Sequence, residues 1–316
     1  MEADVPSLHE LFGPDAISEE TRQVNDALKA QIAAAPQPDS LDAARHAFAT
    51  GASGIPVSPQ SSRARSQTLS TAAGDIGVRV LVPEVVRGIY LHIHGGGWVL
   101  GANDMWDDML ESLVRNAGLA CMSVAYRLAP EHPFPAARDD CVAAATWLVE
   151  NAEREFGTSC LLIGGESAGA HLAALTLLRL RDAGLGKPFK AANLMYGCFD
   201  LGLTPSLRMA AETPVIDRAG TERFIAAFSG GADPDHPALS PLYADLRDLP
   251  PALFSVGTLD PLLDDSLFMH MRWQAAGNPS ELAVYPGGVH GFNCLTGQLA
   301  EAANAKAEAF LKAFAP

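Results

Sequence analysis

Short apolar runs alternate with long helical patterns along most of this chain. Strands are predicted at 76–82, 88–93, 119–126, 160–164, 191–196, 252–257 and 282–285, where apolar residues alternate or run continuously. Helices are predicted at 137–156, 168–182, 265–276 and 298–314. Strands that alternate with helices of this length form a mostly parallel sheet with helices on both faces. We therefore predict an α/β fold, whose ligands bind at the carboxyl edge of the sheet.

Two segments do not follow this alternation. An amphipathic helix is expected after Ser18, a second one at 40–49, and a connector rich in Gly, Pro and Ser at 50–66. The segment 200–239 carries several Pro and Gly residues around a helix expected at 221–228. We expect both segments to form a lid, or cap, over the carboxyl edge of the sheet. The expected division is 1–50 for the N-terminal part of the cap, 51–200 for the first part of the core, 201–239 for the cap insertion and 240–316 for the second part of the core.

Charge and composition exclude several classes of partner. The chain has 22 Lys and Arg against 37 Asp and Glu, a net charge of −15, which repels phosphate backbones and anionic lipids. We expect no nucleic-acid partner and, since no apolar run is long enough, no membrane span. The N-terminal stretch MEADVPSLHELFG does not read as a signal peptide. The five cysteines are widely spaced without a CxxC pair, which indicates free thiols in a reducing cytoplasm and no structural metal.

The sequence Gly165-Glu166-Ser167-Ala168-Gly169 lies between a predicted strand and a predicted helix. GxSxG in this setting is typical of a sharp turn that lifts a nucleophilic serine above the sheet. The turn also aims the unpaired N–H groups of the helix N-terminus at a developing anion. The pattern predicts Ser167 as the nucleophile.

A glycine run, His94-Gly95-Gly96-Gly97-Trp98, follows the strand predicted at 88–93. Three consecutive glycines are costly in folding entropy unless their backbone must approach another group closely. Such a run at a strand end, paired with the N–H that follows a nucleophile, supplies the donors of an oxyanion hole. Which of its N–H groups point inward is not given by the run itself.

A serine nucleophile needs a base and an acid, which around a GxSxG turn follow it along the chain in the order Ser, acid, His. His290 lies in the Gly-rich loop before the last helix and is the predicted base, whereas His171 and His270 fall inside predicted helices. Asp260 follows a predicted strand and is the predicted acid. Its rivals Asp264 and Asp265 are expected to cap the next helix.

Three motifs in this order carry a family resemblance. His94–Trp98, the stretch YRLAPEHPFPAARDD at 126–140 and GESAG at 165–169 resemble the hormone-sensitive lipase family of carboxylesterases, from about residue 60 to the C-terminus. The resemblance implies an α/β-hydrolase fold with an eight-stranded sheet, and a helical cap from the N-terminus and an insertion after the sixth strand.

The resemblance also bears on single residues. It places the oxyanion hole at the N–H groups of Gly96 and Gly97, together with Ala168 after the nucleophile. It supports His290 through an HGF signature and Asp260 through a DPL context. Four positions depart from the family: Glu166 replaces the Asp and Ala170 the last Gly of its common GDSAGG, His171 replaces its usual Asn, and Tyr196-Gly197 replaces its Tyr-Pro turn.

These residues predict a serine carboxylesterase that hydrolyses short- to medium-chain acyl esters through an acyl-enzyme. It needs no cofactor or metal, takes a small ester as its partner, and is a possible homodimer by resemblance. A metal pair at His92 and His94 is disfavoured because the residues that follow, GGGW, supply no further ligand, and a nucleotide site is disfavoured because no GxGxxG is present. His94 is expected to order its loop, and Glu131 either buttresses the site or is a surface acid. The alternatives are a non-catalytic small-molecule receptor on the same fold, or an amidase or acyltransferase that uses the same triad.

Overall fold

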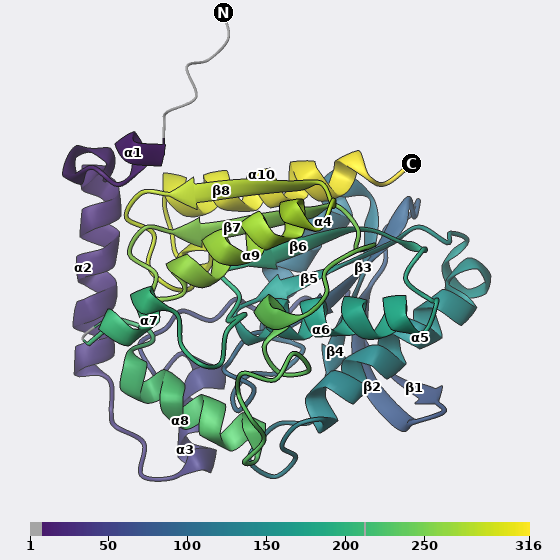
Figure 1. Ribbon diagram of the computed structural model, residues 1–316, viewed down its shortest axis with the longest axis horizontal. Coiled ribbons are helices and arrows are strands. Elements are labelled where there is room, and N and C mark those ends of the chain that lie inside the picture. Colours follow the sequence, from purple (N-terminus) through teal and green to yellow (C-terminus); the bar gives the residue numbers. More distant parts are fainter. Residues whose placement is uncertain (1–7, 212) are drawn as a thin grey trace, which may run out of the picture.

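The computed structural model describes residues 8–211 and 213–316. Within them, eight strands form one sheet in the order β1-β2-β4-β3-β5-β6-β7-β8 (Figure 1). β2 pairs antiparallel with β1 and β4, and every other pair is parallel. The bounds are β1 Arg65–Thr71, β2 Gly74–Leu81, β3 Gly88–Ile93, β4 Leu119–Ala125, β5 Leu161–Glu166, β6 Phe189–Met195, β7 Ala252–Gly257 and β8 Ser280–Tyr285. The predicted mostly parallel, eight-stranded α/β sheet is confirmed.

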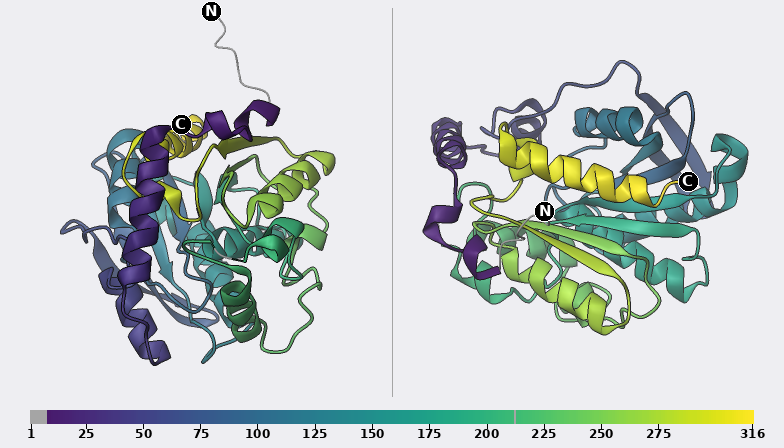
Figure 2. Two further views of the ribbon diagram at one scale, coloured as in Figure 1. Left: turned by 90° about the vertical axis from the view of Figure 1, so that its left-hand side faces the viewer. Right: turned by 90° about the horizontal axis from the view of Figure 1, so that it is seen from above.

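Helices cover both faces of this sheet (Figure 2). α4 and α10 lie on one face, and α5, α6 and α9 lie on the other. In the described part of the chain, no helix is long and apolar enough to cross a membrane. The bounds are α1 Leu8–Leu11, α2 Glu19–Ala34, α3 Leu41–Thr50, α4 Asp107–Ala117, α5 Ala136–Phe156, α6 Ala168–Asp182, α7 Pro205–Met209, α8 Arg218–Ser229, α9 Leu263–Ala275 and α10 Gln298–Ala313, with short 3-10 turns at Pro14–Ala16, Pro241–Tyr243 and Phe292–Cys294.

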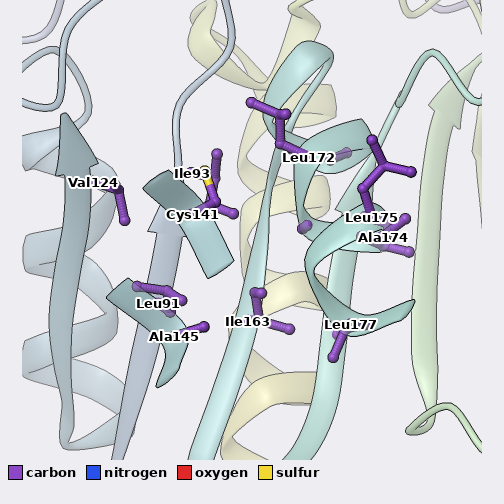
Figure 3. Packing of buried hydrophobic residues seen from close by; sticks show 14 of the residues in the cluster. Leu91, Ile93, Val124, Cys141, Ala145, Ile163, Leu172, Ala174, Leu175 and Leu177 are labelled. Atoms are coloured by element: carbon purple, nitrogen blue, oxygen red, sulfur yellow. The ribbon is translucent and has the colours of Figure 1, made fainter. Parts of the chain in front are cut away.

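The two faces of the central strand β3 feed two separate cores. Ile89, Leu91 and Ile93 point toward α5 and α6, whereas Tyr90 packs on the side of α4 and α10. Figure 3 shows Leu91 and Ile93 together with the side chains of α5 and α6 that cover them. All four side chains are fully buried, because in a strand successive residues face opposite sides and both sides of this sheet are covered.

The strand β1 and the helix α4 lie outside the predicted ranges, as do the short helices α1 and α7. β1 is an edge strand with a single buried apolar side chain, Leu69, so its sequence RSQTLST has no apolar alternation to reveal it. Its first residues fall inside the predicted connector. α4 does carry an amphipathic pattern, with Leu110, Leu113, Val114 and Ala117 buried at helical spacing.

The N-terminal helices and the segment after β6 lie beside the carboxyl ends of the strands. Figure 1 shows α2 next to the arrowheads of β7 and β8, with α3, α7 and α8 nearby. The side-chain amide of Asn25 on α2 donates to the carbonyl of Gly287 after β8, at 2.8 Å. The division of the chain into cap and core segments stays a prediction.

Truncating a buried side chain of the central strand should destabilise the fold. In Leu91→Ala, the lost burial and the remaining cavity should lower the free energy of unfolding by about 2–5 kcal/mol. Urea unfolding at neutral pH measures this difference. The matched control is Val85→Ala, whose side chain is 71% exposed and should change stability little. Equal losses in the two variants would contradict the packing described above.

Candidate active site

Ser167 sits at a strained turn between β5 and α6. Its backbone has φ 56° and ψ −120°, a conformation that residues with a side chain rarely adopt. Such a residue costs about 1–3 kcal/mol and persists only where its surroundings hold it. Here the N–H of Ser167 donates to the carbonyl of Met195 at the end of β6, at 2.9 Å. The turn therefore fixes the serine above the carboxyl edge of the sheet.

Glycine is required on both sides of this serine because the backbone of β3 passes against it. A Cβ on Gly165 or on Gly169 would lie 1.9 Å from the carbonyl oxygen of Ile93. Relief would require the backbone of β3 to move, since the obstructing atom is not part of a flexible side chain. The two glycines of GxSxG are thus fixed by close approach to the strand that leads into the glycine run.

The predicted triad residues form one hydrogen-bond chain. The hydroxyl oxygen of Ser167 lies 2.9 Å from Nε2 of His290, and Nδ1 of His290 lies 3.1 and 3.0 Å from the two carboxylate oxygens of Asp260. Asp260 also accepts a hydrogen bond from the N–H of Leu262 at 2.8 Å. Asp260 and His290 are only 3% and 6% exposed, so water hardly competes for these bonds.

The loops after β7 and β8 bring the acid and the imidazole to Ser167. Asp260 follows β7, where its N–H donates to the carbonyl of Gly257 at 3.2 Å. His290 follows β8, and its ring packs edge-on against Tyr196 with 4.8 Å between ring centroids. The hydroxyl of Tyr196 donates to Asn293 in the same loop. Tyr196 therefore places an aromatic wall behind the imidazole, a contact that the sequence did not reveal, whereas the departure from the family at this turn is Gly197.

The expectation that Asp264 and Asp265 cap the next helix is wrong. Both lie inside the first turn of α9, whose N-cap residue is Leu262. Asp265 instead accepts hydrogen bonds from the N–H groups of Phe199 and Asp200 at 2.7 and 2.9 Å and from the hydroxyl of Thr204 at 2.6 Å. Desolvation raises its pKa to about 7, against these three donors, which favour the anion. The buried carboxylate of Asp265 thus holds the backbone of the loop after β6 in place.

The other candidate imidazoles lie apart from the serine. Nδ1 of His236 accepts a hydrogen bond from the N–H of Ala238, and His236 is exposed. Nδ1 of His270 lies 2.9 Å from the hydroxyl of Ser280, and burial lowers the pKa of His270. His290 is therefore the imidazole that the structure brings to Ser167.

The glycine run forms a tight turn over the serine. The carbonyl of Gly96 accepts from the N–H groups of Val99 and Leu100, at 3.2 and 2.8 Å. Gly96 and Gly97 have φ of 118° and 59°, and a Cβ on Gly96 would lie 2.2 Å from the carbonyl oxygen of Leu100. A Cβ on Gly97 would meet the ring of Phe224 on α8 at 2.7 Å. We call residues 94–100 the oxyanion loop from here on, for its expected role.

The two histidines that suggested a metal pair are both engaged in other contacts. His92 places Nδ1 2.8 Å from the hydroxyl of Ser123 and Nε2 3.0 Å from the carboxylate of Glu166. His94 donates from Nδ1 to the carbonyl of Gly95 at 2.8 Å and stacks on Tyr126, and burial lowers its pKa to about 3. Within residues 8–211 and 213–316, no group of three or more His, Cys, Asp or Glu side chains is placed to hold a metal ion.

His171 joins three segments beneath the oxyanion loop. Its Nδ1 accepts the indole N–H of Trp98 at 3.0 Å, and its Nε2 donates to the carbonyl of Leu239 at 2.5 Å. The ring is fully buried, and desolvation lowers its pKa to about 4, so it is neutral at pH 7. This pattern needs a proton on Nε2 and none on Nδ1. His171 was set aside as a base, and the structure gives it a bridging position instead.

The serine opens into a cavity of about 730 Å³. Gly96, Gly97, Ala168 and His290 line the same cavity as Ser167. Apolar walls come from the N-terminal helices and from the segment after β6, with side chains that include Leu28, Ile32, Phe48, Val215, Ile216 and Phe224. The cavity falls in the size range of small-molecule sites and meets the serine at its floor.

The buried neutral His171 predicts a specific acid dependence of stability. A histidine in the unfolded chain titrates near 6.5, whereas His171 titrates at about 4 in the fold. The unfolded state therefore binds more protons, and His171 lowers the free energy of unfolding by up to about 3 kcal/mol as pH falls from 6.5 to 4. In His171→Asn this loss should vanish. The free energy of unfolding, measured with denaturant between pH 7 and 4, should then fall less steeply with decreasing pH than in the wild type. An unchanged slope would contradict the assignment.

Comparison with known proteins adds an independent line of support. A family model described as the alpha/beta hydrolase fold matches residues 90–294. Carboxylesterase NlhH of Mycobacterium tuberculosis is 40% identical over 229 residues, which cover 69% of this chain and 71% of that protein. Esterase LipI of the same organism is 35% identical over 249 residues, 75% of this chain and 77% of that one.

Solved structures agree with these relatives. An esterase from the bacterial hormone-sensitive lipase family matches with a TM-score of 0.78 and 29% identity, over 94% of this chain and 98% of that chain. The chain belongs to the α/β-hydrolase fold family and, within it, to the hormone-sensitive lipase group of carboxylesterases.

Proposed function

We propose that this protein hydrolyses carboxylic esters through an acyl-enzyme formed on Ser167. The observation that carries the proposal is the hydrogen-bond chain from Ser167 through His290 to Asp260, at 2.9 and 3.0 Å, on the floor of a cavity. The relatives named carboxylesterase and esterase support the same reaction. The triad is thus Ser167 as nucleophile, His290 as base and Asp260 as acid.

The first half of the reaction acylates the serine. Ser167 Oγ attacks the ester carbonyl while Nε2 of His290 takes its proton, within hydrogen-bond reach at 2.9 Å. Asp260 holds the imidazole in the tautomer with a proton on Nδ1 and stabilises the imidazolium that forms. His290 then returns the proton to the leaving alcohol, and the acyl group stays on Ser167.

The oxyanion of the tetrahedral intermediate binds to backbone donors. Ala168 is the first residue of α6, so its N–H has no partner within the helix. The N–H groups of Gly96 and Gly97 complete the hole, since both residues line the cavity at the serine. Removing one strong donor of this kind costs about 3–4 kcal/mol of transition-state stabilisation.

Water completes the reaction. His290, neutral again after the alcohol has left, takes a proton from a water molecule that attacks the acyl carbonyl. The second tetrahedral intermediate collapses, His290 returns this proton to Oγ of Ser167 as the acyl–oxygen bond breaks, and the carboxylic acid leaves. Side chains, backbone and water supply every group in this sequence, so the proposal requires no cofactor or metal.

The walls of the cavity set the substrate class. Side chains from the N-terminal helices and from the segment after β6 close it over the serine, which supports their assignment as a cap. Mostly apolar walls and a volume of about 730 Å³ suit short- to medium-chain acyl esters. A small ester is therefore the proposed partner, with neither nucleic acid nor membrane engaged.

The alternatives are less well supported. A receptor on this fold does not need a complete hydrogen-bond chain at the serine. The relatives described above are named for ester hydrolysis, which favours an esterase over an amidase or an acyltransferase. We keep two further expectations as proposals. The five free thiols fit a reducing compartment such as the cytoplasm. The second proposal is a homodimer, which analytical ultracentrifugation would detect.

Hydrolysis of p-nitrophenyl butyrate tests the nucleophile. The wild type should turn over this ester, and Ser167→Ala should lose several orders of magnitude in kcat because no acyl-enzyme can form. Release of p-nitrophenol is followed by absorbance. The control is Ser61→Ala, a serine that bonds Glu111 away from the site. Turnover that persists in Ser167→Ala would mean that another residue is the nucleophile, and no turnover in the wild type would favour the receptor.

The acid is tested by the isosteric change Asp260→Asn. An amide would donate toward Nδ1 of His290 and favour the wrong tautomer, so kcat should fall by about 10³–10⁴-fold with the fold intact. Asp264→Asn is the matched control, because its carboxylate caps Ser206 on α7 instead of facing the imidazole. A loss in Asp264→Asn equal to that in Asp260→Asn would overturn the assignment of the acid.

A further inference from the structure

Arg45 reaches from the N-terminal helix α3 into the loops beneath the oxyanion hole. Its Nε donates to the carbonyl of Val99 and its Nη2 to the carbonyl of Ala129, both at 2.9 Å. Nη1 and Nη2 also donate to the two carboxylate oxygens of Glu131, each at 2.7 Å. The guanidinium thus binds a carboxylate and two backbone carbonyls at once.

The two carbonyls belong to loops that meet at the oxyanion hole. Val99 lies in the oxyanion loop, and its N–H donates to the carbonyl of Gly96. Ala129 lies in the loop after β4, and its N–H donates to the carbonyl of Trp98 at 3.0 Å. The oxyanion loop is therefore bonded to the loop after β4, and Arg45 binds both across that junction.

The residue type suits this task better than any other cation. A guanidinium is planar and presents its donors in a fixed fork, so it can satisfy a carboxylate on one edge and carbonyls on others. A lysine ammonium is a point charge without that fork. The side chain of Arg45 is 24% exposed, whereas that of Glu131 is 50% exposed. Glu131 thus pairs with the guanidinium from the solvent side, while Nε and the second N–H of Nη2 bind the two carbonyls.

We propose that Arg45 is a positioning residue for the oxyanion hole. Through Val99 it fixes the turn that presents the N–H groups of Gly96 and Gly97, so the N-terminal segment supports the chemical step as well as covering the cavity. Glu131 orients the guanidinium. In this proposal Glu131 buttresses the site and is not simply a surface acid. The inference rests on the proposed function, because it concerns stabilisation of the oxyanion in ester hydrolysis.

A purely structural role makes a different prediction. If Arg45 only anchored α3, its loss would loosen one wall of the cavity, raise KM and lower the melting temperature, but leave kcat unchanged. Misplaced oxyanion donors weaken the transition state more than the bound ester, so kcat should fall. The split between kcat and KM therefore separates the two roles.

The test uses three variants of the full chain. Arg45→Met keeps the apolar stem without donors, Arg45→Lys keeps the charge without the fork, and Glu131→Gln keeps the inner contacts. Each is assayed with p-nitrophenyl acetate, and with a trifluoromethyl ketone, which forms an adduct on Ser167 whose oxyanion occupies the hole. The control is Arg218→Met, which removes an exposed arginine paired with Glu222.

The expected results follow from the geometry. Arg45→Met should lower kcat by about 10–100-fold and weaken binding of the ketone by a similar factor, with little change in KM. Arg45→Lys should show a smaller loss of the same kind, Glu131→Gln a loss below that of Arg45→Met, and Arg218→Met none. If Arg45→Met does not fold, Arg45→Lys decides by the same two readouts.

The inference is overturned if kcat and ketone affinity match the wild type while only KM or the melting temperature changes. This failure is distinguishable from failure of the proposed function. In the latter case the wild type itself would not hydrolyse the ester or bind the ketone, whereas here the wild type would do both.

Discussion

The close approach of β3 to the turn at Ser167 is the constraint on which the site depends. The carbonyl of Ile93 lies where a Cβ of Gly165 or Gly169 would be, so the two backbones are in direct contact. This contact lets the chain hold Ser167 at a positive φ above the sheet. It also places the residues after Ile93, the oxyanion loop, beside the serine. The proposed nucleophile and the proposed anion donors are therefore positioned by one packing relation between two neighbouring strands.

Segments far from the sheet reach the same loop from other sides. Arg45 binds it from the N-terminal helices, the ring of Phe224 packs on Gly97 from α8, and His171 receives Trp98 from below. Flexible glycines would otherwise leave the loop free to adopt many conformations. Preorganised donors stabilise a developing charge most, because they need not reorient during the reaction. The segments proposed as the cap thus contact both the cavity and the oxyanion loop.

Local patterns in the sequence were sufficient for much of this description. The alternation of strands and helices gave the sheet, and GxSxG together with the loop positions of Asp260 and His290 led to residues that the structure brings within hydrogen-bond distance. β1 could not be predicted because this edge strand buries a single apolar side chain and so carries no periodic signal. α4 had such a signal, and its amphipathic spacing could have been recognised.

What could not be predicted are contacts between residues far apart in the chain. Asp265 has the sequence position of a helix cap, yet its carboxylate binds backbone more than 60 residues away. Arg45 and Glu131 are separated by 86 positions, and the bond from Trp98 to His171 spans 73. Such pairs are set by how the layers pack, which periodicity and motif spacing do not encode.

The central claim is that Ser167 becomes covalently modified during turnover. Intact-protein and peptide mass spectrometry after treatment with a fluorophosphonate tests it most directly. The account predicts one adduct per chain, on the peptide that contains Ser167, and little labelling in His290→Ala. An adduct on another residue, or equal labelling of Ser167 without His290, would contradict it.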